Sequence, residues 1–145
     1  MAVVIDANLA LALFLRLPYT EQAYRLMDRL RERKTALLAP LLWEYECLSG
    51  FHRAVRLGII HPQEAAEFMN DLLALEIERV LPTVQSHQSA LRWAERLGQS
   101  KIYDAQYVAL AEQSGAELWS ADRRLVNDLQ GQGVAWAHWI GEEIT

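Results

Sequence analysis

Short apolar runs alternate with longer amphipathic segments along the whole chain. The runs are four to six residues long and read as buried strands; they lie at 2–5, 35–39, 77–81, 117–120 and 134–139. The segments between them carry the spacing of helices, which predicts helices at about 8–17, 20–34, 40–57, 61–75, 83–98, 102–114 and 122–129. Strand and helix therefore alternate, which predicts an α/β fold with a mostly parallel central sheet and helices on both faces.

Local signals predict where several helices begin and end. We expect Pro18 to stop the first helix, Thr20 to cap the second and Pro40 to open the third. Thr83 is expected to cap the helix that ends at Gly98. These signals leave no obvious linker, so residues 1–145 are expected to form a single domain.

The composition supports a globular enzyme or binding domain. Of the 145 residues, 52% are hydrophobic, which allows a core without covalent staples. No apolar run approaches the roughly 18–20 residues that span a bilayer, and the start has no basic leader region, so we expect neither a membrane segment nor a signal peptide. The single cysteine, Cys47, excludes a disulfide within the chain and a thiolate zinc site. We therefore expect a protein of the reducing cytoplasm, with Cys47 as a small buried residue.

Charge and motif content exclude several function classes. A net charge of −5 argues against a coat protein that binds nucleic acid without sequence preference, although local basic patches could still hold phosphates. The chain has no glycine-rich phosphate loop and no GxSxG elbow, and its four histidines lack metal-ligand spacing such as HExxH. Nucleotide hydrolysis by a P-loop, serine hydrolysis and zinc peptidase chemistry are not expected.

Acidic residues fall where a parallel sheet places its ligands. Asp6 follows the first strand directly, and Asp122 follows the strand at 117–120 by two residues; ligands gather beyond such strand ends. Asp104 lies in the first turn of its helix and Glu46 lies inside the third helix. Each acid alone is also explained as a helix cap, a dipole partner or a surface residue. Together they would need a cation, and their hard oxygens favour magnesium or manganese over zinc.

Four sequence strings resemble the motifs of one family. They are VVIDAN at 3–8, APLLWEYE at 39–46, YDAQYVALAE at 103–112 and LWSADRRL at 118–125. In this order and spacing they resemble the PIN-domain family, and within it the VapC-type toxins of bacteria and archaea. The resemblance implies a doubly wound, three-layer α/β/α fold and a metal-dependent endoribonuclease.

The resemblance assigns roles to individual residues. It implies an acidic quartet whose members are Asp6, Glu46, Asp104 and Asp122. Asn8 matches a small polar residue two positions after the first acid. Ser120 stands where the family usually has threonine, and its hydroxyl could orient a carboxylate or a water bound to the metal.

The choice of glutamate in the third helix has an alternative, Glu44. On a helical wheel Glu44 falls near apolar positions such as Leu48, whereas Glu46 falls near Ser49 and Arg53. The family places its glutamate six residues after the proline and just after an apolar or aromatic residue. Glu46 meets both conditions, so it is the predicted member of the quartet.

Basic residues near the acidic strings are candidates for holding RNA phosphates; they are Arg53, Lys101, Arg123 and Arg124. The alternative for each is a solvated surface charge. The five tryptophans are more often core or interface residues than platforms for base stacking.

The resemblance also implies a mechanism and partners. Asp6, Asp104 and Asp122 would coordinate Mg²⁺ or Mn²⁺, and Glu46 would coordinate it or act as a base toward water. The implied partners are an RNA substrate, a cognate antitoxin protein and a second copy of the chain. Two alternatives remain: a PIN-like RNA- or protein-binding module without catalysis, and a phosphatase with a nucleophilic aspartate. The phosphatase's Asp-x-Asp pattern is absent because position 8 is asparagine.

Overall fold

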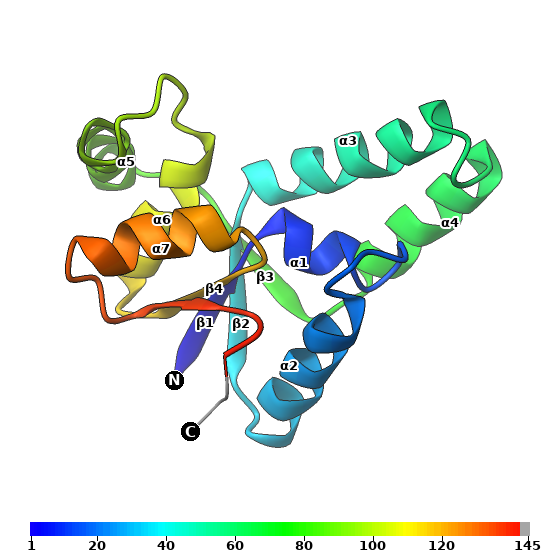
Figure 1. The fold of residues 1–145 in the computed structure, drawn as a ribbon, viewed down its shortest axis with the longest axis horizontal. Helices are drawn as coiled ribbons and strands as arrows, with labels where there is room; N and C mark the ends of the chain where they lie inside the picture. The colour runs from blue at the N-terminus through cyan, green and yellow to red at the C-terminus, as the bar shows by residue number, and fades with distance from the viewer. Residues whose placement is uncertain (143–145) are drawn as a thin grey trace.

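The computed structural model describes residues 1–142, and its strands form one parallel sheet in the order β3-β2-β1-β4-β5 (Figure 1). All four strand pairings are parallel, as the alternating pattern predicts. The strands are β1 Ala2–Ile5, β2 Ala36–Pro40, β3 Ile77–Val80, β4 Glu117–Ser120 and β5 Ala137–Trp139.

Helices flank both faces of the sheet, which gives the predicted three-layer α/β/α architecture (Figure 1). Those on one side connect β1, β2 and β3; they are α1 Ala7–Leu11, α2 Thr20–Glu32, α3 Leu42–Arg56 and α4 Pro62–Leu73. Those on the other side are α5 Val84–Leu97, α6 Tyr103–Ser114 and α7 Arg123–Gly131. No helix in the described part of the chain has the length and apolar character that a membrane crossing requires.

The centre of the sheet is buried on both faces. Val3, Val4 and Ile5 of β1 are at most 1% exposed, because helices cover the strand from either side. Helix α6 packs across β1, β2 and β4, and its Val108 is fully buried. Burying side chains of this size stabilises the fold by roughly 1.5–3 kcal/mol each. The strand ends are therefore held in place by a well-packed centre of the sheet.

The first helix is shorter than its apolar pattern predicts. The expected helix at 8–17 ends as α1 at Leu11, and Pro18 plays no part in stopping it. The turn that follows is held by side chains: the Thr20 hydroxyl donates to the Leu15 carbonyl and accepts from the Leu17 amide, at 3.0 and 2.9 Å. These bonds satisfy backbone groups that a continued helix would have used. Thr20 is therefore the first residue of α2 and not its cap.

Other boundaries are partly as predicted. Thr83 caps α5 by accepting from the Ser86 amide at 3.1 Å, and Gly98 ends that helix with a φ of +64°. Pro40, however, closes β2 and does not open α3. The last strand begins at Ala137 instead of residue 134, because residues 135–136 still form a turn.

The sheet has its topological switch point between β1 and β4. The chain leaves β1 toward β2 and leaves β4 toward β5, so the connections diverge on either side of this pair. Such a divergence opens a crevice beyond the carboxyl ends of the two strands, where doubly wound proteins bind their ligands.

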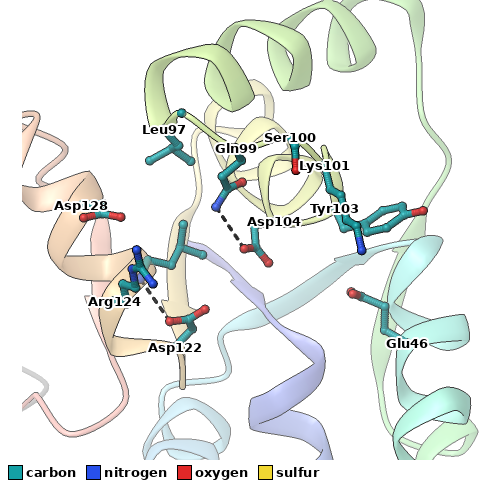
Figure 2. A pocket seen from close by; sticks show the side chains of 12 residues that line it. Glu46, Leu97, Gln99, Ser100, Lys101, Tyr103, Asp104, Asp122, Arg124 and Asp128 are labelled. Carbon is teal, nitrogen blue, oxygen red and sulfur yellow. Dashed lines mark hydrogen bonds between the residues drawn. The ribbon is translucent and has the colours of Figure 1, made fainter.

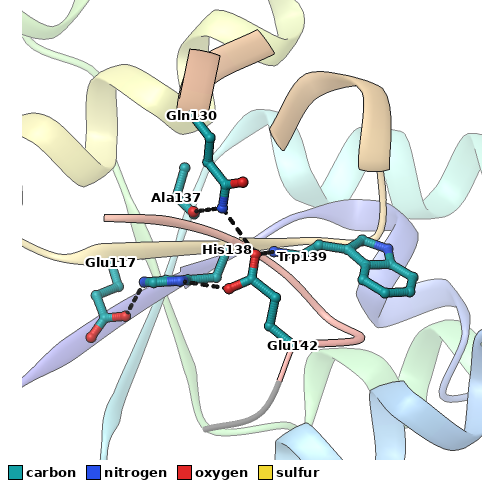
Figure 3. A network of polar contacts seen from close by, with 6 residues as sticks. All are labelled: Glu117, Gln130, Ala137, His138, Trp139 and Glu142. Atoms are coloured by element: carbon teal, nitrogen blue, oxygen red, sulfur yellow. Dashed lines mark hydrogen bonds and ion pairs between the residues drawn. The ribbon is translucent and has the colours of Figure 1, made fainter. Parts of the chain in front are cut away.

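A polar network ties the edge strand β5 to its surroundings (Figure 3). His138 lies between two carboxylates, with its Nε2 2.6 Å from Glu117 and its Nδ1 3.1 Å from Glu142. Gln130 and the Trp139 amide also donate to Glu142, at 2.9 and 3.2 Å. Desolvation acts to raise the pKa of Glu142, but these hydrogen bonds outweigh it and lower the pKa. We call this group the His138 bridge; it consists of Glu117, Gln130, His138, Trp139 and Glu142.

Candidate functional site

Asp6 lies at the carboxyl end of β1 and caps α1. One carboxylate oxygen accepts from the Leu9 amide at 2.8 Å, and the other accepts from the Ser120 hydroxyl at the end of β4. The side chain is only 7% exposed. Burial raises the pKa of Asp6 from its ordinary value to about 6, and the charge of Asp122 adds to the increase.

Asp122 caps α7 and is linked to the same serine. Its carboxylate accepts from the Leu125 amide at 3.1 Å, and its own amide donates to the Ser120 hydroxyl oxygen at 2.9 Å. The Ser120 hydroxyl thus accepts from the backbone of one acid and donates to the carboxylate of the other. The hydroxyl therefore contacts a carboxylate, which is the geometry that the predicted orienting role requires.

Asp104 projects from the first turn of α6. The side-chain amide of Gln99, in the loop before α6, donates to it at 3.2 Å. Desolvation raises the pKa of Asp104, and the charge of Asp122 raises it further. The charge of Asp122 therefore acts on Asp104 across the crevice.

Glu46 reaches the crevice from α3. The Tyr107 hydroxyl of α6 donates to its carboxylate. Burial and the charge of Asp104 raise the pKa of Glu46, whereas the tyrosine hydrogen bond lowers it. Burial and the Glu46 charge also raise the pKa of Tyr107, so its hydroxyl stays protonated and acts as a donor.

The geometry favours Glu46 over Glu44 as the acid at the crevice. Glu44 is held in an ion pair with Arg79, with 2.9 Å between carboxylate oxygen and guanidinium nitrogen. That guanidinium also lies over the Trp43 ring, 5.7 Å from its centroid. Glu44 thus forms an ion pair with a residue of β3, while Glu46 lines the crevice.

The four acids line two adjoining hollows, which together we call the acidic cleft. The first, of roughly 590 Å³, lies between α3, α7 and the loop before α6, and Figure 2 shows three of the acids facing it. The second, of roughly 410 Å³, extends between α1 and α3. Both are lined by Glu46, Asp104 and Asp122, and Asp6 and Asn8 line the second. The predicted quartet and Asn8 thus meet in one place.

Three of the four predicted basic residues line the cleft. Lys101 and Arg124 line the first hollow and Arg53 lines the second. Arg123 points elsewhere: its guanidinium lies over the Trp139 ring, 4.4 Å from the centroid. Within residues 1–142, no Lys, Arg or His forms an ion pair with any of the four acids. The acids are therefore left without a cation of the protein's own.

Sequence reasoning missed three residues at the cleft. Tyr107 follows Asp104 by one helical turn, and this spacing could have placed it on the same face of α6. Gln99 lies in a loop, where no periodic signal exists. Tyr19 lines the second hollow, and burial with the charges of Asp6 and Asp122 raises its pKa.

The chemistry of the cleft fits a hard divalent cation. Within residues 1–142, no three Asp, Glu, His or Cys side chains stand close enough to form a finished ion site. The donor set is nevertheless all carboxylate and partly buried, and within residues 1–142 none of the four acids forms an ion pair. Magnesium is commonly held by one or two carboxylates directly and by others through water. The open acidic cleft therefore suits magnesium better than it suits a cation that needs a closed cage of protein ligands.

Comparison with known proteins agrees with this geometry. The model of the PIN domain matches residues 3–127 of the chain. Ribonuclease VapC3 of Pyrobaculum aerophilum is 33% identical over 128 residues, which cover 86% of this chain and 92% of that protein.

Solved structures show the same fold at lower identity. A toxin–antitoxin complex from Klebsiella pneumoniae gives a TM-score of 0.70 at 14% identity, covering 98% of this chain and 100% of that one. A Pyrobaculum aerophilum protein also gives 0.70, at 23% identity over 97% and 84% of the two chains. VapC20 of Mycobacterium tuberculosis, a toxin that cleaves the sarcin–ricin loop, gives 0.61 at 16% identity over 83% and 88%. With the family model matching most of its length, the chain belongs to the PIN-domain family.

Proposed function

We propose that this protein is a metal-dependent endoribonuclease and the toxin of a VapBC-type toxin–antitoxin pair. The observation that carries the proposal is the meeting of Asp6, Glu46, Asp104 and Asp122, from four separate elements, in one cleft. Within residues 1–142, none of these acids is held in an ion pair. The likeness to a protein named as a VapC ribonuclease supports the choice of reaction.

Asp6, Asp104 and Asp122 hold Mg²⁺ or Mn²⁺ in this proposal, directly or through water. When bound, such a cation supplies charge that neutralises the phosphodiester and makes a water molecule more acidic. The Ser120 hydroxyl fixes the Asp6 carboxylate, and the helix caps fix Asp6 and Asp122. These contacts orient the ligands before the cation arrives.

Glu46 either joins these ligands or accepts the proton of the attacking water. It stands on the opposite wall of the cleft from α7, where it faces Asp104 (Figure 2). Its raised pKa makes it a stronger base than an exposed glutamate, which suits proton transfer near neutral pH.

The basic residues give the RNA strand a path across the acids. Arg53 follows Glu46 by seven residues on α3, a separation of about 10 Å along the helix axis. Lys101 and Arg124 line the other hollow. A strand whose cleaved phosphate lies over the acids would meet a cation on either side, so local charge overrides the net charge of −5.

Two protein partners belong to the proposal. The first is a cognate antitoxin that covers the acidic cleft, and the second is another copy of this chain in a homodimer. The likeness to a toxin–antitoxin complex supports the first in fold only. Co-expression with the product of the neighbouring gene should yield a tight complex and relieve growth arrest, and light scattering should give about twice 16.6 kDa.

A cleavage assay on labelled single-stranded RNA tests the proposed function. We expect internal cuts by the wild-type protein in magnesium and none by Asp104→Asn. If both proteins bind the RNA and neither cuts it, the chain is a PIN-like binding module and the nuclease proposal fails. If expression of the chain leaves bacterial growth and RNA intact, the toxin assignment fails.

A further inference from the structure

Glu46 lies on α3, whose main packing partners do not include α6, the helix that bears Asp104. Helix α3 packs against α1 and α4, and in Figure 1 it projects with α4 beyond the edge of the sheet. Its main contact with the sheet is with β2, and α6 is not among its main packing partners in the described residues. Its buried face, with Trp43, Cys47 and Phe51, fixes the helix in the core, but Glu46 is only half-buried. No main packing contact between α3 and α6 sets its side chain relative to α6.

Helix α6, by contrast, is fixed to the centre of the molecule. It packs on β1, β2, β4 and α5. Asp104 and Tyr107 lie one turn apart on it, and Tyr107 is 3% exposed. The Tyr107 hydroxyl donates across the cleft to Oε1 of Glu46, so the firmly packed helix contacts the acid of the projecting one.

We propose that Tyr107 is a positioning residue whose hydroxyl holds Glu46 at the acidic cleft. Helix α6 then sets the place of two acids, Asp104 directly and Glu46 through Tyr107. The inference rests on the proposed ribonuclease function, and Tyr107 itself touches neither RNA nor cation in it.

The chemistry of the contact suits this role. The Tyr107 hydroxyl is neutral, so it orients the carboxylate without cancelling the negative charge that a cation or a proton needs. The bond uses Oε1 of Glu46, and Oε2 has no partner among the described residues. Tyr107 thus holds one oxygen of a residue that lines both hollows of the cleft.

A purely structural hydrogen bond would also satisfy a buried tyrosine, so the test must separate the two roles. Tyr107→Phe removes the hydroxyl and keeps the ring in the core. Tyr24→Phe is the matched control, because the Tyr24 hydroxyl also donates a hydrogen bond, at 2.6 Å to the Leu13 carbonyl, and Tyr24 lines neither hollow of the acidic cleft. Both variants are compared in steady-state RNA cleavage and in unfolding without metal.

We expect Tyr107→Phe to lower kcat by about 10- to 100-fold with KM changed less than about 3-fold, since misplacing a reacting group has effects of this size. Tyr24→Phe should keep the wild-type kcat. In the Glu46→Gln background, Tyr107→Phe should change kcat less than about 2-fold, because the group that it positions has already been lost. Unfolding without metal should show the same coupling between the two positions, independent of activity.

Glu46→Asp is the second variant, because it shortens the acid out of reach of Tyr107 and leaves the core untouched. Its kcat should fall as much as that of Tyr107→Phe, and it can be measured even if Tyr107→Phe folds poorly. Normal kcat in Tyr107→Phe or in Glu46→Asp would overturn the inference, as would an equal fall in kcat with and without the Glu46 carboxylate. An inactive wild-type protein would instead count against the proposed function, so the two failures are distinguishable.

Discussion

Two clusters of carboxylates in this molecule have surroundings that shift their pKa values in opposite directions. In the His138 bridge, Glu117 and Glu142 flank an imidazole and donors surround Glu142, whose pKa is lowered (Figure 3). In the acidic cleft, Asp6, Glu46 and Asp104 have raised pKa values. Both clusters lie beside the same sheet and both are partly buried. The difference is that only the bridge contains a basic side chain between its acids.

The comparison distinguishes acids that stabilise the fold from acids that we propose to bind a cation. A buried carboxylate with partners supports the structure, whereas uncompensated neighbouring carboxylates destabilise it until a cation binds. The acids of the cleft also cap helices, so the capping explanation and the site explanation hold together for Asp6 and Asp122. Capping needs only an oxygen that asparagine also offers. Charge is therefore the property that separates the two roles.

The largest expected effect follows from removing that charge. Asp6→Asn, Asp104→Asn and Asp122→Asn should each lower RNA cleavage by orders of magnitude while the metal-free fold keeps or gains stability. Glu142→Gln, in the His138 bridge, should do the reverse, losing stability and keeping cleavage. Cleavage rates beside melting curves in EDTA measure both. Near-normal cleavage by the three aspartate variants would remove the distinction.

Metal binding should stabilise the cleft and leave the bridge unaffected. Magnesium at about 100 times its dissociation constant would contribute about 2.7 kcal/mol, which corresponds to a rise in Tm of roughly 5–10 °C for a chain of this size. Glu142→Gln should show the same rise, and Asp6→Asn a much smaller one. Identical melting curves in EDTA and in magnesium would argue against a shared cation site.

The two clusters should respond oppositely to pH. The folded-state pKa of Asp6, about 6, exceeds its ordinary 3.8, so the native state binds more protons between these values and stability falls as pH rises through them. The effect is on the order of 3 kcal/mol. Glu142 has a lowered pKa, so its contribution is lost as pH falls. Urea unfolding of metal-free protein between pH 4 and pH 8 should therefore be flatter for Asp6→Asn, and a profile identical to wild type would contradict this.

The smallest effect concerns the neighbouring glutamates of α3. Glu44→Gln breaks the ion pair with Arg79, whose partners are partly exposed, and should cost less than about 1 kcal/mol with little change in cleavage. Glu46→Gln should abolish most cleavage. If Glu44→Gln were the inactive variant, the choice between these acids would be reversed.

The sequence predicts the sheet and most helices because their signals are local and periodic. The strand at 117–120 and the cap at Thr83 follow from apolar runs and turn residues alone. The turn after α1 does not, because the Thr20 and Tyr24 hydroxyls that hold it come from the next helix. An apolar pattern cannot report such tertiary hydrogen bonds.

In the candidate site, too, local signals are predictable from the sequence and tertiary contacts are not. The four acids are recognisable from strand ends and motif order, but the donors that hold them are not. Gln99 lies in a loop without a periodic signal. The spacing of Tyr107 from Asp104 indicates a shared face of α6, but its contact with Glu46 depends on how α3 and α6 meet, which no spacing along the chain encodes. Arg123 and Arg124 are adjacent in sequence, yet only Arg124 lines the cleft, since Arg123 packs over Trp139.

The most direct test of the account is cleavage of total RNA by one preparation of wild-type protein, first stripped with EDTA and then supplied with magnesium or manganese. The acids of the cleft lack a cation of their own, so we expect no cleavage in EDTA and discrete products when the cation is restored. Asp104→Asn, treated in parallel, should remain inactive in both conditions. Equal cleavage in EDTA and in magnesium, with the aspartate variant as active as wild type, would contradict the central claim that these carboxylates form a cation-dependent site for cutting RNA.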